Sequence, residues 1–261
     1  MNIVKVEQHI IKWLTDYVSK SGLKGFVVGV SGGIDSAVTS TLCAKTGYPT
    51  LLLNMPIHQK SRQFKRSNDH ISWLEKKHHN VSGITIDLTK IFESYSVSLP
   101  SQVQDDLSMA NLRSRIRMSN LYVFASNYQY LVVGTGNKVE DFGVGFYTKY
   151  GDGGVDISPI ADLLKSEVFS LAKHLGILPS IQNASPTDGL WDDDRNDEDQ
   201  LGATYEELEW AMHYIEAKSG LPSLTEQQKS ILNIYNQHHK TNQHKMLPIP
   251  VCNIPGELKN N

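Results

Sequence analysis

The sequence predicts an α/β fold, a doubly wound (Rossmann-like) parallel sheet of five short strands flanked by helices. Apolar stretches of four to six residues alternate along the chain with segments of helical periodicity, as in βαβ units. Two of the expected strands run directly into segments rich in glycine and hydroxyl residues, SGGIDS (31–36) and GTGN (134–137). Because parallel sheets bind ligands beyond the carboxyl ends of their strands, the sequence predicts a ligand site where these segments meet.

The individual elements follow from periodicity and from glycine and proline breaks. The first is an amphipathic helix at 3–20 with Ile10, Trp13 and Tyr17 on its apolar face. The segment from about 80 to 108 has little apolar content and, beyond its strand, is expected to be a loop. Strands are expected at 26–30, 49–57, 83–88, 130–137 and, as a shorter fifth strand, 155–157; further helices are expected at 35–46, 61–79, 108–127, 162–175, 204–218 and 225–240.

Length and composition favour one domain over residues 1–261, with the helix at 3–20 and a C-terminal tail at 241–261 as appendages. The formal charge of −3 argues against a nucleic-acid binder held by bulk electrostatics. The apolar runs are far shorter than the roughly 20 residues that span a membrane, and no targeting segment is recognisable. Cys43 and Cys252 are too few for a disulfide scaffold, which fits a reducing, cytoplasmic location.

The hexamer SGGIDS (31–36) is the strongest chemical signal in the sequence. Its glycines allow close approach of the backbone, and the start of the following helix offers free N–H groups to an anion. Asp35 suits such a site only if a cation such as Mg²⁺ lies between it and the anion. The alternative is a tight turn capped by Asp35 or Ser36.

A second polar segment spans residues 134–156 and contains two lysines and several acids. Glu140 could share a metal ion with Asp35, Lys149 could meet a phosphate, and Asp152 and Asp156 could accept hydrogen bonds from hydroxyl or amine donors. The alternative is a glycine-rich surface turn. Further along, the acidic stretch WDDDRNDEDQ (191–200) is expected to be a solvated loop or a mobile rim of the site.

SGGIDS resembles the PP-loop of the ATP pyrophosphatases, which cleave ATP between the α- and β-phosphates and adenylate an oxygen of their substrate. Further motifs are similar, in order, to those of the NAD synthetase family: GTxNxxE from Gly134, GFxTKYGDGG from Gly145, DLLKSEV (162–168), SPTDGLW (185–191) and HKMLPIP (244–250). The resemblance implies an adenine nucleotide alpha hydrolase-like fold. Many family members carry histidine where this chain has Asn137 and one residue fewer between Glu140 and Lys149; some share the form seen here.

The resemblance also implies a role for each matching residue. Asp35 and Glu140 would hold Mg²⁺, and Lys165, expected on an exposed helix surface, would contact ATP and spread the charge that develops in the reaction. Apart from the resemblance, ammonium is not nucleophilic, so a carboxylate near its entry point has to help remove a proton, and Asp152 is our candidate. ATP would contact Gly29, Val30, Ser31, Gly32, Gly33, Ile34, Asp35, Ser36, Thr135, Lys165 and Thr187, and deamido-NAD would contact Arg115, Lys149, Asp156, His244 and Lys245.

The implied reaction is ATP-dependent amidation of deamido-NAD to NAD through an acyl-adenylate, with ammonia as nitrogen donor and AMP and pyrophosphate as products. The first strand begins near residue 26, which leaves no room upstream for a glutaminase domain, so we expect free ammonia or a separate glutaminase subunit. Family members are homodimers, and we expect the N-terminal helix to bury its apolar face against the partner. Two alternatives stay open: another PP-loop ligase such as a tRNA-modifying adenylase, and a non-catalytic nucleotide-binding module.

Overall fold

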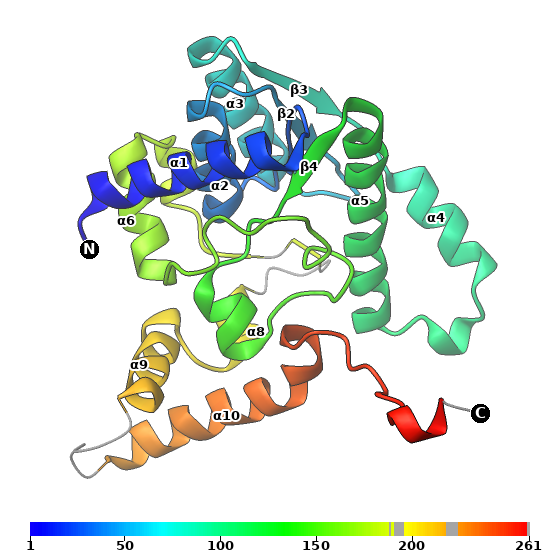
Figure 1. The fold of residues 1–261 in the computed structure, drawn as a ribbon, viewed down its shortest axis with the longest axis vertical. Coiled ribbons are helices and arrows are strands. Elements are labelled where there is room, and N and C mark those ends of the chain that lie inside the picture. Colours follow the sequence, from blue (N-terminus) through cyan, green and yellow to red (C-terminus); the bar gives the residue numbers. More distant parts are fainter. Residues whose placement is uncertain (188, 191–195, 218–223, 260–261) are drawn as a thin grey trace.

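The fold is built on a parallel sheet in which the order of the strands reverses direction next to β1. The computed structural model describes residues 1–187, 189–190, 196–217 and 224–259. The strand order is β3-β2-β1-β4, and every pair is parallel. The chain therefore moves outward from β1 to β3 and returns to the other side of β1 (Figure 1). In such a topology the crevice for a ligand lies between the carboxyl ends of the two strands where the direction changes, here β1 and β4. The strands are β1 (Gly25–Gly29), β2 (Thr50–Asn54), β3 (Val81–Thr85) and β4 (Tyr130–Val133).

Helices cover both faces of the sheet because the strand side chains alternate between two apolar clusters (Figure 1). In β1, Phe26 and Val28 belong to one cluster and Val27 to the other. The first face carries α1 (Ile3–Ser21), α2 (Ile34–Lys45), α3 (Ser61–Lys77) and α6 (Lys165–Leu175); the second carries α4 (Thr89–Ser98) and α5 (Asp106–Tyr128).

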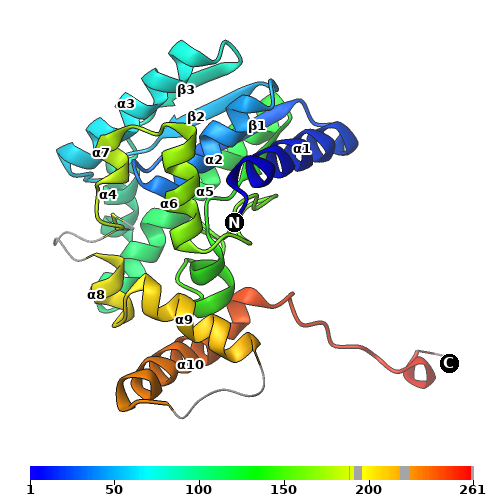
Figure 2. The ribbon, with the colours of Figure 1, turned by 90° about the vertical axis from the view of Figure 1, so that its left-hand side faces the viewer.

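A third apolar cluster lies beyond the carboxyl ends of the strands. Helices α9 and α10 lie side by side there, and the C-terminal tail extends away from them (Figure 2). They pack on η2, a π-helix that follows β4. These elements are η2 (Val139–Val144), α8 (Asp197–Leu201), α9 (Tyr205–Glu216) and α10 (Glu226–Met246); short turns of helix also occur at η1 (Ser101–Val103), α7 (Pro179–Gln182) and η3 (Gly256–Leu258).

The expected α/β class and parallel sheet are confirmed, but the fifth strand is wrong. Ile157 forms only an isolated parallel bridge to Val133. The carboxylate of Asp156 accepts the backbone N–H of Val132 at 2.8 Å. A side chain therefore takes a hydrogen bond that a longer strand would have made through its backbone, and the described sheet has four strands.

Three further expectations need correction. The segment expected to be a loop up to residue 108 contains α4, which forms because Phe92 packs into the cluster on the second face. Part of the acidic stretch 191–200 is helical, since α8 begins at Asp197; residues 191–195 lie outside the described residues. The last long helix continues to Met246, so the tail begins at 247 rather than 241.

One side of the N-terminal helix packs on its own subunit, while the contact of its apolar face with a partner stays a prediction. Ile10, Leu14 and Val18 are buried in the cluster of the first face. Trp13 and Tyr17 stay 38% and 40% exposed, with their rings 5.5 Å apart. Among the described residues, none of the helices has the length and apolarity needed to cross a bilayer.

Candidate active site

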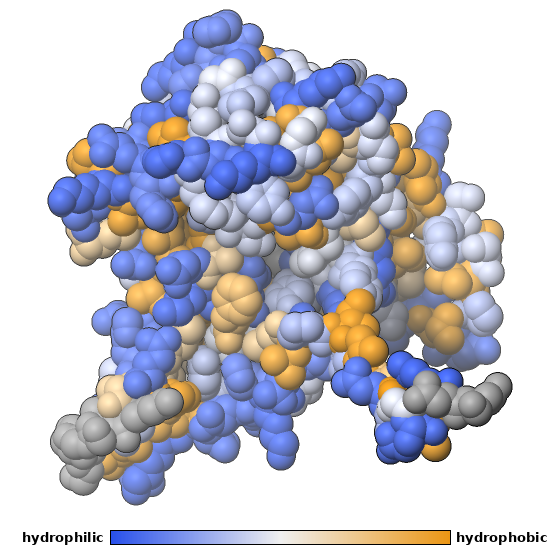
Figure 3. Space-filling view, viewed as in Figure 1, coloured by the Kyte–Doolittle hydropathy of each residue, from blue (hydrophilic) through white to orange (hydrophobic). Residues whose placement is uncertain are grey.

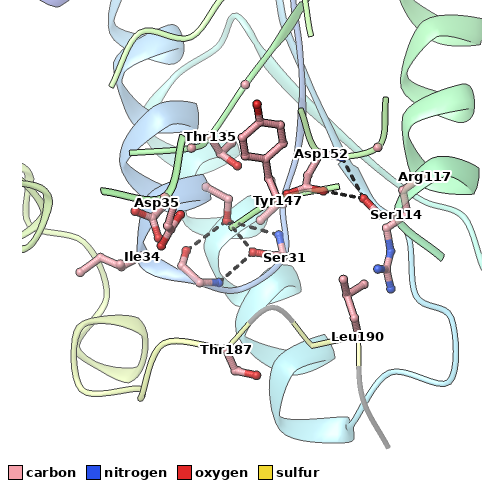
Figure 4. Close-up of a pocket in the computed structure, with 18 of the residues that line it drawn as sticks. Ser31, Ile34, Asp35, Ser114, Arg117, Thr135, Tyr147, Asp152, Thr187 and Leu190 are labelled. Carbon is pink, nitrogen blue, oxygen red and sulfur yellow. Dashed lines mark hydrogen bonds between the residues drawn. The ribbon is translucent and has the colours of Figure 1, made fainter. Parts of the chain in front are cut away.

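The loop between β1 and α2 is held open by its own serine side chains. The backbone N–H of Ser31 donates to Ser36 Oγ at 3.3 Å, and the N–H of Gly33 donates to Ser31 Oγ at 3.2 Å (Figure 4). Ser36 Oγ donates to the Gly33 carbonyl at 3.0 Å. No side chain caps α2, whose N-cap is Gly33. The structure thus favours a phosphate-binding loop over a capped turn, because the first N–H groups of α2 remain available to an anion.

Gly32 gives this loop its shape. Its φ is +82°, and a β-carbon there would lie 2.8 Å from the Gln63 carbonyl oxygen of α3. Its own carbonyl accepts a hydrogen bond from Arg66 Nε at 3.1 Å. A side chain at position 32 would therefore push the loop away from α3, so glycine is required by both conformation and space.

A buried lysine joins the two acids that were expected to hold a metal ion. Lys165 Nζ lies 2.7 Å from Asp35 Oδ2 and 3.0 Å from Glu140 Oε1. The lysine side chain is 3% exposed, so the expectation of an exposed helix lysine is wrong. The reason is its position as the first residue of α6, where it points from the helix start into the crevice.

Burial shifts the pKa values within this cluster. Burial alone lowers the pKa of Lys165, but the Asp35 and Glu140 carboxylates outweigh it and raise that pKa above its ordinary value. Burial raises the pKa of Glu140, and the nearby Asp35 charge adds to the increase, whereas Lys165 and Tyr205 partly oppose it. The lysine is therefore the protonated partner of the cluster, and its charge partly offsets the effect of burial on Glu140.

The two carboxylates fit Mg²⁺ only together with other oxygen ligands. Glu140 uses Oε1 for its hydrogen bonds, and no described residue donates to Oε2. In the described part of the chain, no group of three or more histidine, cysteine or acidic residues is arranged to hold a metal. Mg²⁺ commonly binds one or two carboxylates plus phosphate oxygens, so Asp35 and Glu140 suit an ion that arrives with a nucleotide.

Asn137 and the π-helix connect these acids. Asn137 is fully buried; its Nδ2 donates to Asp35 Oδ1 at 3.1 Å, and its Oδ1 accepts the N–H groups of Val139 and Glu140. A π-helix accommodates an additional residue within a helical turn. The π-helix η2 begins directly after Lys138 and carries Glu140, whose Oε1 meets the same Lys165 ammonium as Asp35 Oδ2.

One cavity lies along these groups at the carboxyl ends of β1 and β4. Asp152 lines it from the loop after η2, and Ser114 and Arg117 line it from α5 (Figure 4). Of the residues expected to contact ATP or metal, all but Gly32 line it: Gly29, Val30, Ser31, Gly33, Ile34, Asp35, Ser36, Thr135, Glu140, Lys165 and Thr187.

None of the five residues expected to bind deamido-NAD lines this cavity, but four of them lie close to one another. Lys149 Nζ donates to the His244 carbonyl at 2.6 Å, and the Arg115 guanidinium lies 3.4 Å from the Lys149 carbonyl. Lys245 Nζ donates to the carbonyls of Gly145 and Tyr147 at 2.9 and 2.8 Å. The end of α10, the loop after η2 and α5 thus meet in one basic cluster.

Asp156 lies apart from that cluster. Its Oδ1 accepts the Tyr122 hydroxyl at 3.0 Å, and its Oδ2 accepts the N–H of Val132. Burial and the Asp156 charge raise the pKa of Tyr122 to about 12. In this structure Asp156 therefore fixes the edge of the sheet against α5.

Asp152 is held in a turn at the wall of the cavity. Its Oδ1 accepts the Ser114 hydroxyl at 2.7 Å and the Thr148 N–H at 2.9 Å. Asp141 lines the same wall, and burial together with Glu140, Asp152 and Asp35 raises its pKa well above the ordinary value.

Several residues of the site were not foreseen from the sequence. Arg113 and Arg117 lie on one face of α5: Arg113 Nη1 donates to the Leu190 carbonyl at 2.8 Å, and Arg117 Nε donates to the Met55 carbonyl at 3.0 Å. Their i, i+4 spacing was a usable signal for this shared face. Tyr205, whose hydroxyl donates to Glu140 Oε1 at 2.6 Å, gave none, because 65 residues separate the two.

The fold and the site together define an α/β protein of the nucleotide-binding class, with a serine–glycine loop beside two acids and a lysine at the carboxyl ends of β1 and β4. Residues 6–248 match the family model described as NAD synthase, and the chain belongs to this family.

The relatives in this comparison are similar over nearly their whole length. The chain is 36% identical to the NH3-dependent NAD+ synthetase of Syntrophomonas wolfei, with all of both chains covered. It is 36% identical to the protein of that name from Methanosarcina acetivorans, with 96% of this chain and 98% of the relative covered. Among solved structures, the NMN synthetase of Francisella tularensis superimposes with a TM-score of 0.85 at 31% identity, over 97% of this chain and 100% of the other.

Proposed function

We propose that this protein converts deamido-NAD to NAD+ by ATP-dependent amidation with ammonia, the last step of NAD biosynthesis, and that residues 1–261 act as one domain. The observation that carries the proposal is the buried Lys165 between Asp35 and Glu140, next to the uncapped start of α2. A purely structural role would not require two acids and a lysine to be buried at a strand end, because such groups are costly to desolvate. The arrangement suits a reaction at a phosphorus atom of a polyphosphate, in which negative charge develops on the phosphate oxygens.

The site residues divide the work of the first step. The nicotinate carboxylate attacks the α-phosphorus of ATP, and pyrophosphate leaves with the electrons of the α–β bridging bond. The N–H groups at the start of α2 and the Lys165 ammonium stabilise the charge on the phosphates. When bound by Asp35 and Glu140, Mg²⁺ would neutralise phosphate charge. Thr135 and Thr187 line the same cavity, where their hydroxyls can orient ATP.

Ammonia then attacks the acyl carbon, and AMP leaves. Ammonium carries no lone pair, so a carboxylate has to help remove a proton. We assign this role to Asp152, which lines the cavity beside Ser114. Arg115, Lys149, His244 and Lys245 form the basic cluster that would receive the dinucleotide, with Asp156 placed at the sheet edge. Ammonia arrives free or from a separate glutaminase subunit.

A second candidate substrate is the mononucleotide. The Francisella tularensis structure is described as an NMN synthetase, and its TM-score of 0.85 and 31% identity make it a substantive relative. The chemistry at the carboxylate is the same for both substrates. The two candidates therefore differ only in whether the basic cluster binds a second nucleotide.

We further propose that the protein acts as a homodimer in the cytoplasm, without nucleic acid or membrane. Apolar side chains are exposed on the side of the molecule that carries α4 and the C-terminal tail (Figure 3). They include Val97 at 88%, Val123 at 66% and Val251 at 76% exposed. A second copy of this chain would cover such a surface, and this side is a second candidate interface besides the N-terminal helix. Sedimentation of the wild type and of Val251→Asp tests this: a wild-type monomer at micromolar concentration contradicts it.

The assay for the function is pyrophosphate release from ATP with ammonium and either deamido-NAD or nicotinate mononucleotide, each component omitted in turn. Deamido-NAD amidation predicts sustained release only when ATP, ammonium and a pyridine substrate are all present, with the dinucleotide preferred. When ammonium alone is omitted, about one pyrophosphate per site should be released, because the adenylation step precedes the attack by ammonia. Preference for the mononucleotide supports the second candidate. Release that is independent of both pyridine substrates contradicts both, and ATP binding without turnover supports a non-catalytic module.

A further inference from the structure

Tyr205, the first residue of α9, reaches the proposed metal site from outside the motif-bearing segments. It is 6% exposed. Its hydroxyl donates to Glu140 Oε1 at 2.6 Å, and Lys165 Nζ lies 4.7 Å from the centre of its ring. The aromatic face and the hydroxyl therefore contact two different members of the charged cluster.

The backbone of Tyr205 is fixed independently of the site. Thr204 and Glu207 form a capping box at the start of α9, and the N–H of Tyr205 donates to Glu198 of α8 at 2.9 Å. The hydroxyl also lies 3.3 Å from Asp197 Oδ2. A rigid helix start thus holds the hydroxyl donor in place, which is what orienting a carboxylate requires.

The pattern of donors on Glu140 indicates what this contact does. Both Lys165 Nζ and the Tyr205 hydroxyl donate to Oε1, and no described residue donates to Oε2. The carboxylate is thereby held through one oxygen while the other stays available. If Lys165 turns toward the phosphates of bound ATP, the Tyr205 hydroxyl is the described donor that remains on Oε1.

We propose that Tyr205 is a positioning residue for the adenylation step: it holds Glu140 in the orientation that binds the nucleotide-bound divalent cation while Lys165 changes partner. This inference deepens the proposed function and rests on it. The predicted consequence is specific, because losing the hydroxyl should weaken cation binding without altering the site for deamido-NAD.

The test measures cation binding without turnover. Mn²⁺ serves as the probe, together with α,β-methylene-ATP, which cannot be cleaved between its α- and β-phosphates, and free Mn²⁺ is followed by electron paramagnetic resonance. Tyr205→Phe keeps the ring and removes only the hydroxyl. The matched control is Tyr214→Phe on the same helix, whose hydroxyl makes no hydrogen bond with a described residue and whose ring packs on Trp210.

We expect Y205F to raise the Kd for Mn²⁺ by about 10- to 100-fold, the range typical for loss of a group that orients a metal ligand. Y214F should bind as the wild type does, and the KM for deamido-NAD should be unchanged in both. In a Glu140→Gln background, Y205F should add no further loss, because its effect acts through Glu140. Wild-type Mn²⁺ affinity in Y205F overturns the proposal, as does an equal loss in the Glu140→Gln background.

This experiment is separable from the test of function. Binding of Mn²⁺ and the ATP analogue needs neither deamido-NAD nor ammonia, so a protein that fails to amidate the dinucleotide still reports on Tyr205. Melting curves of Y205F with and without the analogue show that the variant is folded and that any lost affinity is not lost structure.

Discussion

Removal of the Lys165 ammonium should destabilise the folded protein strongly, and by an amount that depends on pH. In Lys165→Met, the side chain keeps nearly its length but the positive charge between Asp35 Oδ2 (2.7 Å) and Glu140 Oε1 (3.0 Å) is lost. The side chains of these acids are only 18% and 15% exposed, so water replaces the ammonium poorly. Breaking a buried ion pair by removing one partner costs about 3–5 kcal/mol.

The pH dependence follows from Glu140. Its pKa is already raised by burial and by the Asp35 charge, and without Lys165 it should rise further. A carboxyl with a raised pKa in the folded state penalises folding above that pKa, and the penalty disappears as the pH falls through it. The loss of stability in the variant should therefore be largest at pH 7.5 and smaller at pH 5.

Urea unfolding at pH 7.5 and at pH 5, followed by tryptophan fluorescence, measures the free energy of unfolding and its dependence on pH; thermal unfolding gives the melting temperature. At pH 7.5 the expected loss corresponds to a decrease of roughly 6–20 °C in melting temperature for a chain of this size. The matched control is Lys173→Met, an exposed lysine on the same helix, which should change stability by about 0.5 kcal/mol or less. A Lys165→Met variant within about 1 kcal/mol of the wild type at pH 7.5, or one whose defect grows toward pH 5, refutes this reasoning.

Three further predictions concern the metal site, the loop after β4 and closure over the substrate. Asp35→Asn should abolish most turnover yet leave the circular dichroism unchanged, because the cation loses an anionic ligand; near-normal pyrophosphate release at saturating Mg²⁺ contradicts this. Gly136→Ala should cost about 1–3 kcal/mol in urea unfolding, since its β-carbon would lie 2.1 Å from Asp141 Oδ1, whereas Gly256→Ala, which meets open space, should be neutral. Residues 241–250 should exchange amide hydrogens more slowly with ATP and deamido-NAD bound, because closure excludes water from the acyl-adenylate; equal exchange in both states means that this segment is not part of a lid.

The sequence predicted those parts of the fold that depend on local pattern. The apolar strand before Ser31 and the glycine-rich turn after Val133 both carry local signals, and the crevice lies where they meet. The fifth strand failed because one side chain, Asp156, competes for a backbone hydrogen bond of β4, and periodicity does not report such competition. Helix α4 was missed because its apolar side chains do not share one buried face: Phe92 is buried, whereas Ile91, Tyr95 and Val97 are exposed.

The site shows the same division. Asp35 and Glu140 were paired by their positions at two strand ends, and the structure brings them to one lysine. Burial of that lysine was not predictable, because an isolated lysine at a helix start resembles a surface residue until the crevice is known. Tyr205 was missed for another reason: its contact with Glu140 spans 65 residues, and it lies in none of the recognised motifs. Asn137 lies in the motif that begins at Gly134, but its contact with Asp35, 102 residues away, was not predicted.

The central claim is that the carboxylate of the substrate is activated by adenylation in the cavity beside Lys165. Deamido-NAD labelled with ¹⁸O in its nicotinate carboxylate tests this directly, with mass spectrometry of the products after a single turnover with ATP, Mg²⁺ and ammonium. The carboxylate oxygen that attacks the α-phosphorus should leave with it, so each AMP should carry one ¹⁸O and pyrophosphate none. Label in pyrophosphate or inorganic phosphate, or unlabelled AMP formed together with NAD+, would contradict this account.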